Sequence, residues 1–280
     1  MDFSIPTETV DLVARIRNFV ETEIYPLEES WQKLSFRELI PQLQEKRQRV
    51  REEGLWTPQI PRSHGGLGLG FLEHALVSEQ LARSPLGHYI FNAQAPDAGN
   101  MEILLEFGTP AQQEQWLTPL LAGDVRSCFS MTEPDRPGSN PVWMETRAER
   151  DGEEYVINGH KWFISNAHRA NFAILIARTE DDPELPQAAN TAFIIDLPFD
   201  GWTEAREIET MHGSTGHSEI IIEDLRVHDS QMLGGRGQGH LLGQYRLGPA
   251  RLAHCMRWIA QAEMALDMTV ERSLERYSHG

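Results

Sequence analysis

The stretch with the most chemical content runs from Arg126 to Asn140 and reads RSCFSMTEPDRPGSN. Its first half, from Ser127 to Met131, has the residue types of a strand, which Thr132-Glu133-Pro134 ends. A loop that contains Gly138 and Ser139 follows. A strand that ends in a hydroxyl residue and opens into a loop of backbone amides can donate several hydrogen bonds to one flat, heteroatom-rich ligand. The alternative interpretation is a strand followed by an ordinary Pro-Gly turn.

A second segment, Asn158 to Asn166, reads NGHKWFISN and places adjacent aromatic residues before a Ser-Asn pair. Together the two segments resemble the flavin-binding strands of the acyl-CoA dehydrogenase family. The first matches the family pattern aromatic-x-x-Thr-Glu-Pro followed by a Gly/Ser loop. The second matches Asn-Gly-x-Lys-x-aromatic-Ile-Thr/Ser-Asn. Both motifs occur in the family's order.

The resemblance implies an FAD-dependent oxidoreductase of fatty acid metabolism and β-oxidation. In the family, FAD removes a hydride from C3 of an acyl-CoA while a carboxylate takes the C2 proton, which gives the trans-2-enoyl-CoA. The electrons then pass to an electron-transferring flavoprotein. The expected partners are therefore an acyl-CoA substrate and that electron acceptor.

The resemblance also assigns roles to residues of the two motifs. Ser165 occupies the Thr/Ser position that contacts the flavin N5, and Phe163 lies against the isoalloxazine ring where the family usually has Trp. Thr132 is directed to the pyrimidine edge, while Gly138 and Ser139 supply donors to the diphosphate. The loop is one residue longer than in the commonest family pattern. The expected cofactor-binding residues are Phe129, Met131, Thr132, Gly138, Ser139, Phe163, Ile164 and Ser165.

Further along the chain, Gly248 to Arg251 matches the family segment that contacts the pantetheine and the acyl end of the substrate. Arg251 is the family's basic residue there, although an ion pair at the start of a helix is an equal alternative. His254, close behind it, is expected to be a satisfied polar group rather than a catalyst. The expected substrate-binding residues are Ser139, Gly248, Pro249, Ala250 and Arg251.

Ala250 stands where a minority of the family carries its catalytic carboxylate, and an alanine cannot abstract a proton. The majority carries the base on a later helix, which would lie beyond residue 280. The resemblance therefore implies a fragment, a split subunit or a degenerate member, with the base outside this chain. A homo-oligomer, or a hetero-oligomer with a chain that supplies the missing helices, is expected. The alternative functions are a non-catalytic subunit and a related flavin oxidase or monooxygenase.

The elements that would position these residues fall into three parts. Residues 1–125 are predicted to form an all-helical domain, with helices expected over the ranges 7–25, 36–53, 72–83, 101–107 and 110–121. Pro26 is expected to end the first helix, Gly54 to cap the second and Thr109 to cap the last. Residues 92–102 are predicted to be a loop before a helix that starts near Asn100, with a wall of the ligand pocket as the alternative.

After Arg126 the hydrophobic period changes from about 3.6 to two, as in strands. Asp151-Gly152 and Asn158-Gly159 are predicted to close tight hairpins. Further strands are expected over the ranges 171–178, 191–197, 202–209 and 218–227, with a surface loop over 179–190. Residues 126–235 are therefore predicted to form a small β-barrel, or a sandwich.

Residues 236–280 are predicted to contain the first helix of a carboxy-terminal helical bundle. This helix is expected to run from His240 to about Tyr277. Pro249 is expected to kink or restart it. Its buried stripe is predicted to contain Leu247, Leu252, Met256, Ile259, Ala262 and Leu266. The fold class is thus α+β. The alternating glycines of residues 65–70 do not follow a strand, so they are predicted to turn the chain rather than to bind a nucleotide.

The composition limits the class of protein. At 280 residues, with 40% hydrophobic and 24% charged residues, the chain is an ordinary globular one. Its net charge of −17 argues against nucleic acid or an anionic membrane as a partner. Cys128 and Cys255 form no motif for a metal or a redox pair and are expected to be buried thiols. No apolar run is long enough to span a bilayer and no signal segment is recognised, so a cytoplasmic location is expected.

Overall fold

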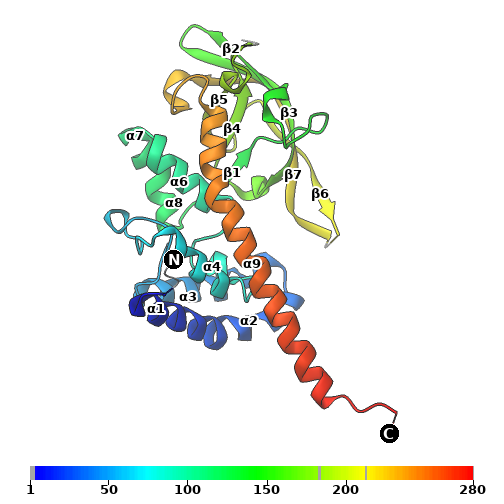
Figure 1. Cartoon of the computed structure of the whole chain (residues 1–280). Helices are drawn as coiled ribbons and strands as arrows, with labels where there is room; N and C mark the ends of the chain where they lie inside the picture. The colour runs from blue at the N-terminus through cyan, green and yellow to red at the C-terminus, as the bar shows by residue number, and fades with distance from the viewer. Residues whose placement is uncertain (1–3, 182–183, 212, 280) are drawn as a thin grey trace. The chain divides into compact units, whose positions relative to one another are not determined.

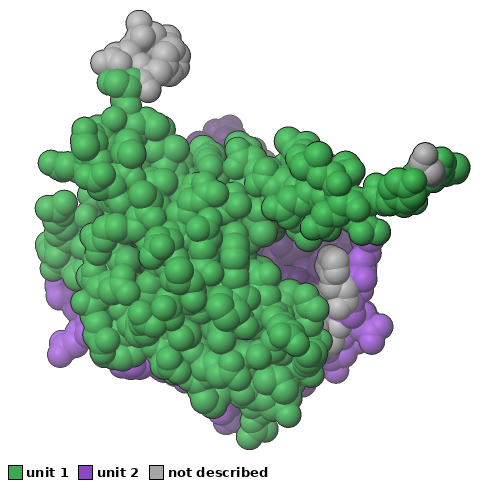
Figure 2. Space-filling view, turned by 90° about the horizontal axis from the view of Figure 1, so that it is seen from below, with its two compact units in different colours: residues 1–94, 249–280 green, residues 95–248 purple. Residues whose placement is uncertain are grey.

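The computed structural model describes residues 4–181, 184–211 and 213–279. The chain divides into two compact units, which Figure 2 shows in different colours. Unit 1 contains residues 1–94 and 249–280, and unit 2 contains residues 95–248. Predictions that concern residues 1–3, at the amino terminus, and residues 182–183, in the acidic loop, lie outside the described residues.

Unit 1 is helical, as expected. Its helices are α1 (Thr7–Phe19), α2 (Tyr25–Lys33), α3 (Phe36–Glu52), α4 (Phe71–Leu81), the short α5 (Gly87–Ile90), and the part of α9 (Gly239–Glu275) that follows Gly248. The prediction that Pro26 ends the first helix is wrong. The helix continues from α1 through a π-helical turn, Val20–Ile24, into α2. Pro26 stands at the start of α2, directly after this π-helical turn.

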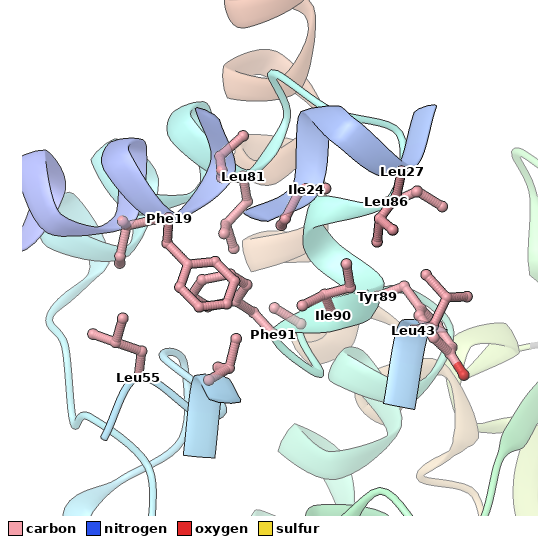
Figure 3. Packing of buried hydrophobic residues seen from close by; sticks show 14 of the residues in the cluster. Phe19, Ile24, Leu27, Leu43, Leu55, Leu81, Leu86, Tyr89, Ile90 and Phe91 are labelled. Atoms are coloured by element: carbon pink, nitrogen blue, oxygen red, sulfur yellow. The ribbon is translucent and has the colours of Figure 1, made fainter. Parts of the chain in front are cut away.

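The core of unit 1 is built from the apolar faces of α1 to α5 and of the segments that join them (Figure 3). The rings of Phe19 on α1 and Phe91 after α5 meet edge to face, with their centroids 5.4 Å apart. Ser35 forms a capping box with Glu38 at the start of α3, and Gly54 follows that helix in the left-handed conformation, as predicted. The glycine loop has a packing role, since a Cβ on Gly66 would lie 2.1 Å from the carbonyl oxygen of Ile60.

Unit 2 begins with α6 (Asp97–Phe107), α7 (Pro110–Gln112) and α8 (Thr118–Ala122), with the π-helical turn Gln113–Leu117 between α7 and α8. Thr109 forms the predicted cap, in a capping box with Gln112. The loop predicted over residues 92–102 is shorter than expected, because helix α6 already starts at Asp97. Asp97 accepts hydrogen bonds from the backbone nitrogen and the hydroxyl of Ser127, at 2.8 and 2.7 Å. These bonds join the first turn of α6 to the sheet.

Between α8 and α9, unit 2 is a mixed sheet (Figure 1). Its strands are β1 (Ser127–Ser130), β2 (Arg147–Asp151), β3 (Glu154–Ser165), β4 (Phe172–Arg178), β5 (Asn190–Asp196), β6 (Trp202–Thr210), β7 (Gly213–His228) and β8 (Met232–Leu233). Their order is β6-β7-β3-β2-β4-β5-β8, and β1 pairs in parallel with β4. Among the described strands no ladder joins β6 to β8, so the predicted barrel is not closed.

One of the two predicted hairpins is wrong. Asp151 pairs with Glu154 across the turn that joins β2 to β3, so the Asp151-Gly152 hairpin is confirmed. Asn158-Gly159 instead lies inside β3, where the pairing with β7 shifts register between Ile157 and Gly159. Gly159 is needed there for space, because a Cβ would lie 2.3 Å from the hydroxyl oxygen of Thr146. The pairing with β7 therefore overrides the local turn preference.

Helix α9 starts at Gly239 and runs through Pro249 without interruption. The predicted buried stripe is only partly correct. Leu247, Leu252 and Met256 are half-buried, whereas Ile259 and Leu266 are 46% and 63% exposed and Ala262 is exposed as well. The residues of α9 that are fully buried include Leu242 and Ala260.

Cys128 is buried as expected, and burial raises the pKa of its thiol. The prediction for Cys255 is wrong, because this thiol is exposed on α9. Over the described part of the chain, no helix combines the length and the apolarity that a membrane crossing requires.

Candidate functional site

The two motifs predicted to share a ligand lie side by side in unit 2. The backbone N–H of Trp162 donates to the carbonyl oxygen of Thr132 at 3.0 Å. One residue earlier in each motif, the ammonium group of Lys161 donates to the carbonyl oxygen of Met131 at 2.9 Å. The side-chain amide of Asn166 donates to the carbonyl oxygen of Ser127, also at 2.9 Å. These bonds join the first residue of β1 and the two residues after its end to the last part of β3 and to Asn166, which follows it.

A buried ion pair fixes the turn at the end of the first motif. Lys161 is fully buried, and its Nζ lies 2.9 Å from Oε1 of Glu133. Glu133 also accepts hydrogen bonds from the backbone nitrogens of Glu145 and Thr146, at 2.7 and 2.8 Å. Burial lowers the pKa of Lys161 to about 8, and the neighbouring Glu133 opposes this shift. The Lys of one motif and the Glu of the other therefore act as one structural unit.

An irregularity in β3 turns the aromatic side chain of Phe163 outwards. The register with β7 shifts between Lys161 and Ile164, and Phe163 has a φ of 52°. This left-handed conformation is rare for a residue with a bulky side chain and is maintained only by its surroundings. As a result the Phe163 side chain is 44% exposed, while Ile164 is 1% exposed and packs in the core of the sheet. Ile164 is therefore a core residue of the sheet and offers almost no surface to a ligand.

Ser165, the predicted flavin contact, is bonded to a histidine that the sequence did not single out. Ser165 and His217 are direct partners across the β3–β7 ladder. The hydroxyl oxygen of Ser165 lies 2.9 Å from Nδ1 of His217. The imidazole ring of His217 also lies beside the ring of Phe163, with their centroids 6.2 Å apart. Phe163, Ser165 and His217 thus form one cluster.

The loop after Thr132 surrounds a small hollow that is open to solvent. Gly138 packs closely on Thr132, because a Cβ on Gly138 would lie 3.2 Å from the methyl group of Thr132. Ser139 is exposed beside it. Of the described residues, those lining the hollow do not include Phe163 or Ser165. They are Met131, Thr132, Glu133, Arg136, Pro137, Gly138, Asn140, Pro141 and Met144.

Phe129, the first of the expected cofactor residues, lies against a half-buried arginine of α9. The guanidinium of Arg246 lies 4.3 Å from the centre of the Phe129 ring. Its Nε donates to Oδ1 of Asn100 at 3.1 Å, and a terminal nitrogen donates to the carbonyl oxygen of Pro96 at 3.3 Å. Burial lowers the pKa of Arg246 to about 10, against the attraction of Glu102 and Asp97. Sequence reasoning missed Arg246, because its partners are distant in the chain.

The expected substrate residues are divided between the two units. Gly248 is the last residue of unit 2, and it is exposed, with open space where a Cβ would stand. Pro249, Ala250 and Arg251 belong to unit 1, where the first two are half-buried and Arg251 is exposed. His254 follows them, and its ring lies 6.0 Å from that of Trp258.

Comparisons with known proteins define the class. Residues 6–124 match the family model for the acyl-CoA dehydrogenase N-terminal domain, and residues 128–226 match that for the acyl-CoA dehydrogenase middle domain. The chain is similar to the FadE2 protein of Mycobacterium tuberculosis, which is assigned as an acyl-CoA dehydrogenase. The two are 35% identical, over 100% of this chain and 70% of that protein. The chain therefore belongs to the acyl-CoA dehydrogenase family.

Other relatives are longer than the chain. It is 35% identical to chicken (Gallus gallus) acyl-CoA dehydrogenase family member 11, over 96% of this chain, but it spans only 36% of that protein. Among solved structures, it is similar to a Mycobacterium abscessus protein assigned as an acyl-CoA dehydrogenase, with a TM-score of 0.92 and 33% identity. The match covers 99% of this chain and 72% of that one. A glutaryl-CoA dehydrogenase in complex with glutaryl-CoA matches with a TM-score of 0.83 and 26% identity, over 100% of this chain and 70% of that one.

Proposed function

We propose that this chain is the flavin-binding and substrate-binding part of an FAD-dependent acyl-CoA dehydrogenase, which oxidises an acyl-CoA to the trans-2-enoyl-CoA. The observation that carries the proposal is the hydrogen bond from Trp162 to Thr132, because it joins the two flavin motifs within one sheet. Family membership supports the same reaction class.

The chemistry of the residues fits FAD. The flavin has a flat apolar face and a heteroatom edge, and its diphosphate needs several donors. Unit 2 offers an exposed Phe163 ring, the hydroxyl of Thr132, and the loop with Gly138 and Ser139 beside an open hollow. Arg136 lies in the same loop as a cation, although it is paired with Glu145 in this structure. FAD would supply the hydride acceptor of the reaction.

Each side chain has a role that its surroundings permit. Phe163 would lie against the isoalloxazine ring and exclude water from one face. Ser165 would donate to N5, and Thr132 would bind the pyrimidine edge, with Phe129 and Met131 as apolar neighbours. Gly138 and Ser139 would hold the diphosphate, while the buried Ile164 would support the Phe163 and Ser165 positions from the core of the sheet.

The substrate contacts are proposed for Ser139 and for the α9 segment from Gly248 to Arg251. Arg251 is the only cation of this segment and would bind an acidic group or a carbonyl of the CoA ester. Ala250 has no group that accepts a proton. The proposed reaction therefore needs a carboxylate base from outside residues 1–280.

The partners are proposed by the same reasoning. An electron-transferring flavoprotein would accept the electrons. A homo-oligomer, or a hetero-oligomer with a chain that supplies the missing helices, would complete the protein. A structure of the electron transferring flavoprotein of Acidaminococcus fermentans also matches this chain, with 25% identity and a TM-score of 0.79. The alternative functions are a non-catalytic or split subunit and a related flavin oxidase or monooxygenase.

The proposal is tested by purifying the chain, adding FAD and measuring visible absorption and flavin fluorescence. We expect a stoichiometric yellow complex. Thr132→Val and Ser165→Ala should each weaken binding about fivefold to tenfold, because each removes one hydrogen bond to the ligand. Thr203→Val is the matched control, since Thr203 is exposed on β6. If both site variants bind FAD as tightly as the wild type, the proposal is refuted.

The reaction is tested with the complete oligomer under anaerobic conditions. Bleaching of the flavin by an acyl-CoA supports the dehydrogenase, whereas binding without bleaching supports a non-catalytic subunit. Rapid reoxidation of the bleached protein by dioxygen, without an electron-transferring flavoprotein, would instead favour the oxidase or monooxygenase.

A further inference from the structure

Ser165 cannot serve two acceptors at once. A serine hydroxyl carries one proton, and its oxygen can also accept a hydrogen bond. In this structure its oxygen lies 2.9 Å from Nδ1 of His217. A neutral imidazole has one N–H, so Nδ1 is either the donor or the acceptor of this bond. If Nδ1 accepts, the proton of Ser165 is committed to His217. If Nδ1 carries the proton, that of Ser165 is available to a ligand.

We propose that His217 is a positioning residue, which donates from Nδ1 to Ser165 and thereby makes the Ser165 hydroxyl a donor to the N5 atom of bound FAD. The inference rests on the proposed function, since FAD is the ligand it names. It goes beyond that function by assigning a role to a β7 residue that lies outside both flavin motifs.

Three features hold His217 in place for this role. It faces Ser165 directly in the β3–β7 ladder, so the contact is set by the register of two long strands. The neighbouring backbone bond, from the N–H of Asn166 to the carbonyl oxygen of Gly216, is 2.7 Å long and fixes the same end of the ladder. The ring of His217 is also packed against Phe163, the proposed wall of the flavin site.

A histidine at position 217 has two tautomers, which a serine or threonine at the same position would not have. When a ligand nitrogen accepts the Ser165 proton, the tautomer of His217 with the proton on Nδ1 becomes favoured. Binding of FAD and the tautomer of His217 are therefore coupled. The coupling requires an acceptor at position 5 of the flavin ring.

The test uses FAD and 5-deaza-FAD, which has C–H in place of N5 and cannot accept this bond. Dissociation constants are measured with the full chain for the wild type, His217→Phe, His217→Asn and Ser165→Ala. Phenylalanine keeps the ring but cannot donate, whereas asparagine keeps a donor near the position of Nδ1. Thermal melting of each variant checks that it folds.

We expect His217→Phe to weaken binding of FAD about fivefold and to leave binding of 5-deaza-FAD unchanged. His217→Asn should stay within about twofold of the wild type, because a donor remains. In the Ser165→Ala background, His217→Phe should have no further effect, because the group it acts through is absent. Nitrogen NMR of His217 should show the proton on Nδ1 when FAD is bound.

The outcomes separate this inference from the proposed function. An equal loss of FAD and 5-deaza-FAD in His217→Phe would show a merely structural role and overturn the inference. So would an undiminished effect in the Ser165→Ala background, or unchanged binding of FAD in a folded His217→Phe. If the wild type binds neither flavin, the proposed function fails, and the inference fails with it.

Discussion

Lys161 and Glu133 form an ion pair in the interior of unit 2, with Nζ of the lysine 2.9 Å from Oε1 of the glutamate. The two residues come from different motifs, and the pair joins the turn after β1 to the middle of β3. Removing one partner of a buried ion pair leaves an uncompensated charge, which is more harmful than losing the attraction itself.

Lys161→Met is therefore expected to lower the free energy of unfolding by about 3–5 kcal/mol, because the Glu133 carboxylate stays buried without its counter-charge. Lys161→Met combined with Glu133→Gln should recover part of this loss. Arg147→Met is the control, since its ion pair with Asp181 is exposed and should contribute less than about 1 kcal/mol. Urea unfolding followed by fluorescence measures all three. Equal effects of Lys161→Met and Arg147→Met would contradict the argument.

The two Asp/Asn-Gly pairs give a second, matched prediction. Gly159→Ala should destabilise the chain by about 1–3 kcal/mol, because its Cβ would overlap Thr146 in a packed region. Gly152→Ala meets no neighbour within 4 Å, but Gly152 has a φ of 67°. It should cost about 1–2 kcal/mol through backbone strain alone. Adding Thr146→Ala should not restore the stability of Gly152→Ala, because a Cβ at position 152 meets no neighbour that could be removed. Chemical denaturation of the variants provides the measurement.

These glycines also show why the sequence predicts some features and misses others. Turn preference is a property of two adjacent residues, and it gave the correct result at Asp151-Gly152, where the chain reverses. At Asn158-Gly159 the same preference gave a wrong hairpin, because pairing of β3 with a strand some sixty residues later is stronger. Long-range pairing of this kind leaves no local signal.

The candidate site follows the same division. Thr132, Phe163 and Ser165 could be found because they belong to compact motifs with fixed spacing. Arg246 and His217 could not, because each acquires its importance only from a partner that is distant in sequence. Closure of the barrel also depends on how the outer strands meet, which alternating hydrophobicity does not specify.

Arg246 provides a third prediction. Arg246→Met should lower the free energy of unfolding by about 2–4 kcal/mol, because Asn100 and Pro96 would lose a donor in a buried environment. It should also raise the pKa of Glu102 further. Burial already raises that pKa to about 7, and Arg246 opposes the shift. Arg272→Met is the control on the same helix, since Arg272 is exposed. Calorimetry measures the stability, and carbon NMR of Glu102 follows its titration.

His88 in unit 1 gives a pH dependence with a defined sign. Its Nε2 lies 2.9 Å from the hydroxyl oxygen of Ser78, and its side chain is buried. Burial lowers the pKa of His88 well below its ordinary value, and Arg257, His74 and His254 lower it further. The unfolded chain takes up a proton near pH 6.5, whereas the folded chain takes it up only at lower pH. The unfolded state therefore binds more protons below about pH 6.5, so stability should be fully present above that pH and should fall as the pH decreases.

The measurement is the melting temperature between pH 7.5 and 5.5. We expect the contribution of His88 to fall over this range, whereas that of Glu102, whose pKa burial raises to about 7, increases as the pH decreases. His88→Gln should reduce the fall, because the amide keeps a hydrogen-bonding group but has no charge to gain. Part of the fall should remain, since burial also lowers the pKa values of His74 and His254. His64→Gln is the control, because His64 is exposed. If His88→Gln and His64→Gln have the same pH profile as the wild type, the buried imidazole is not the group that responds.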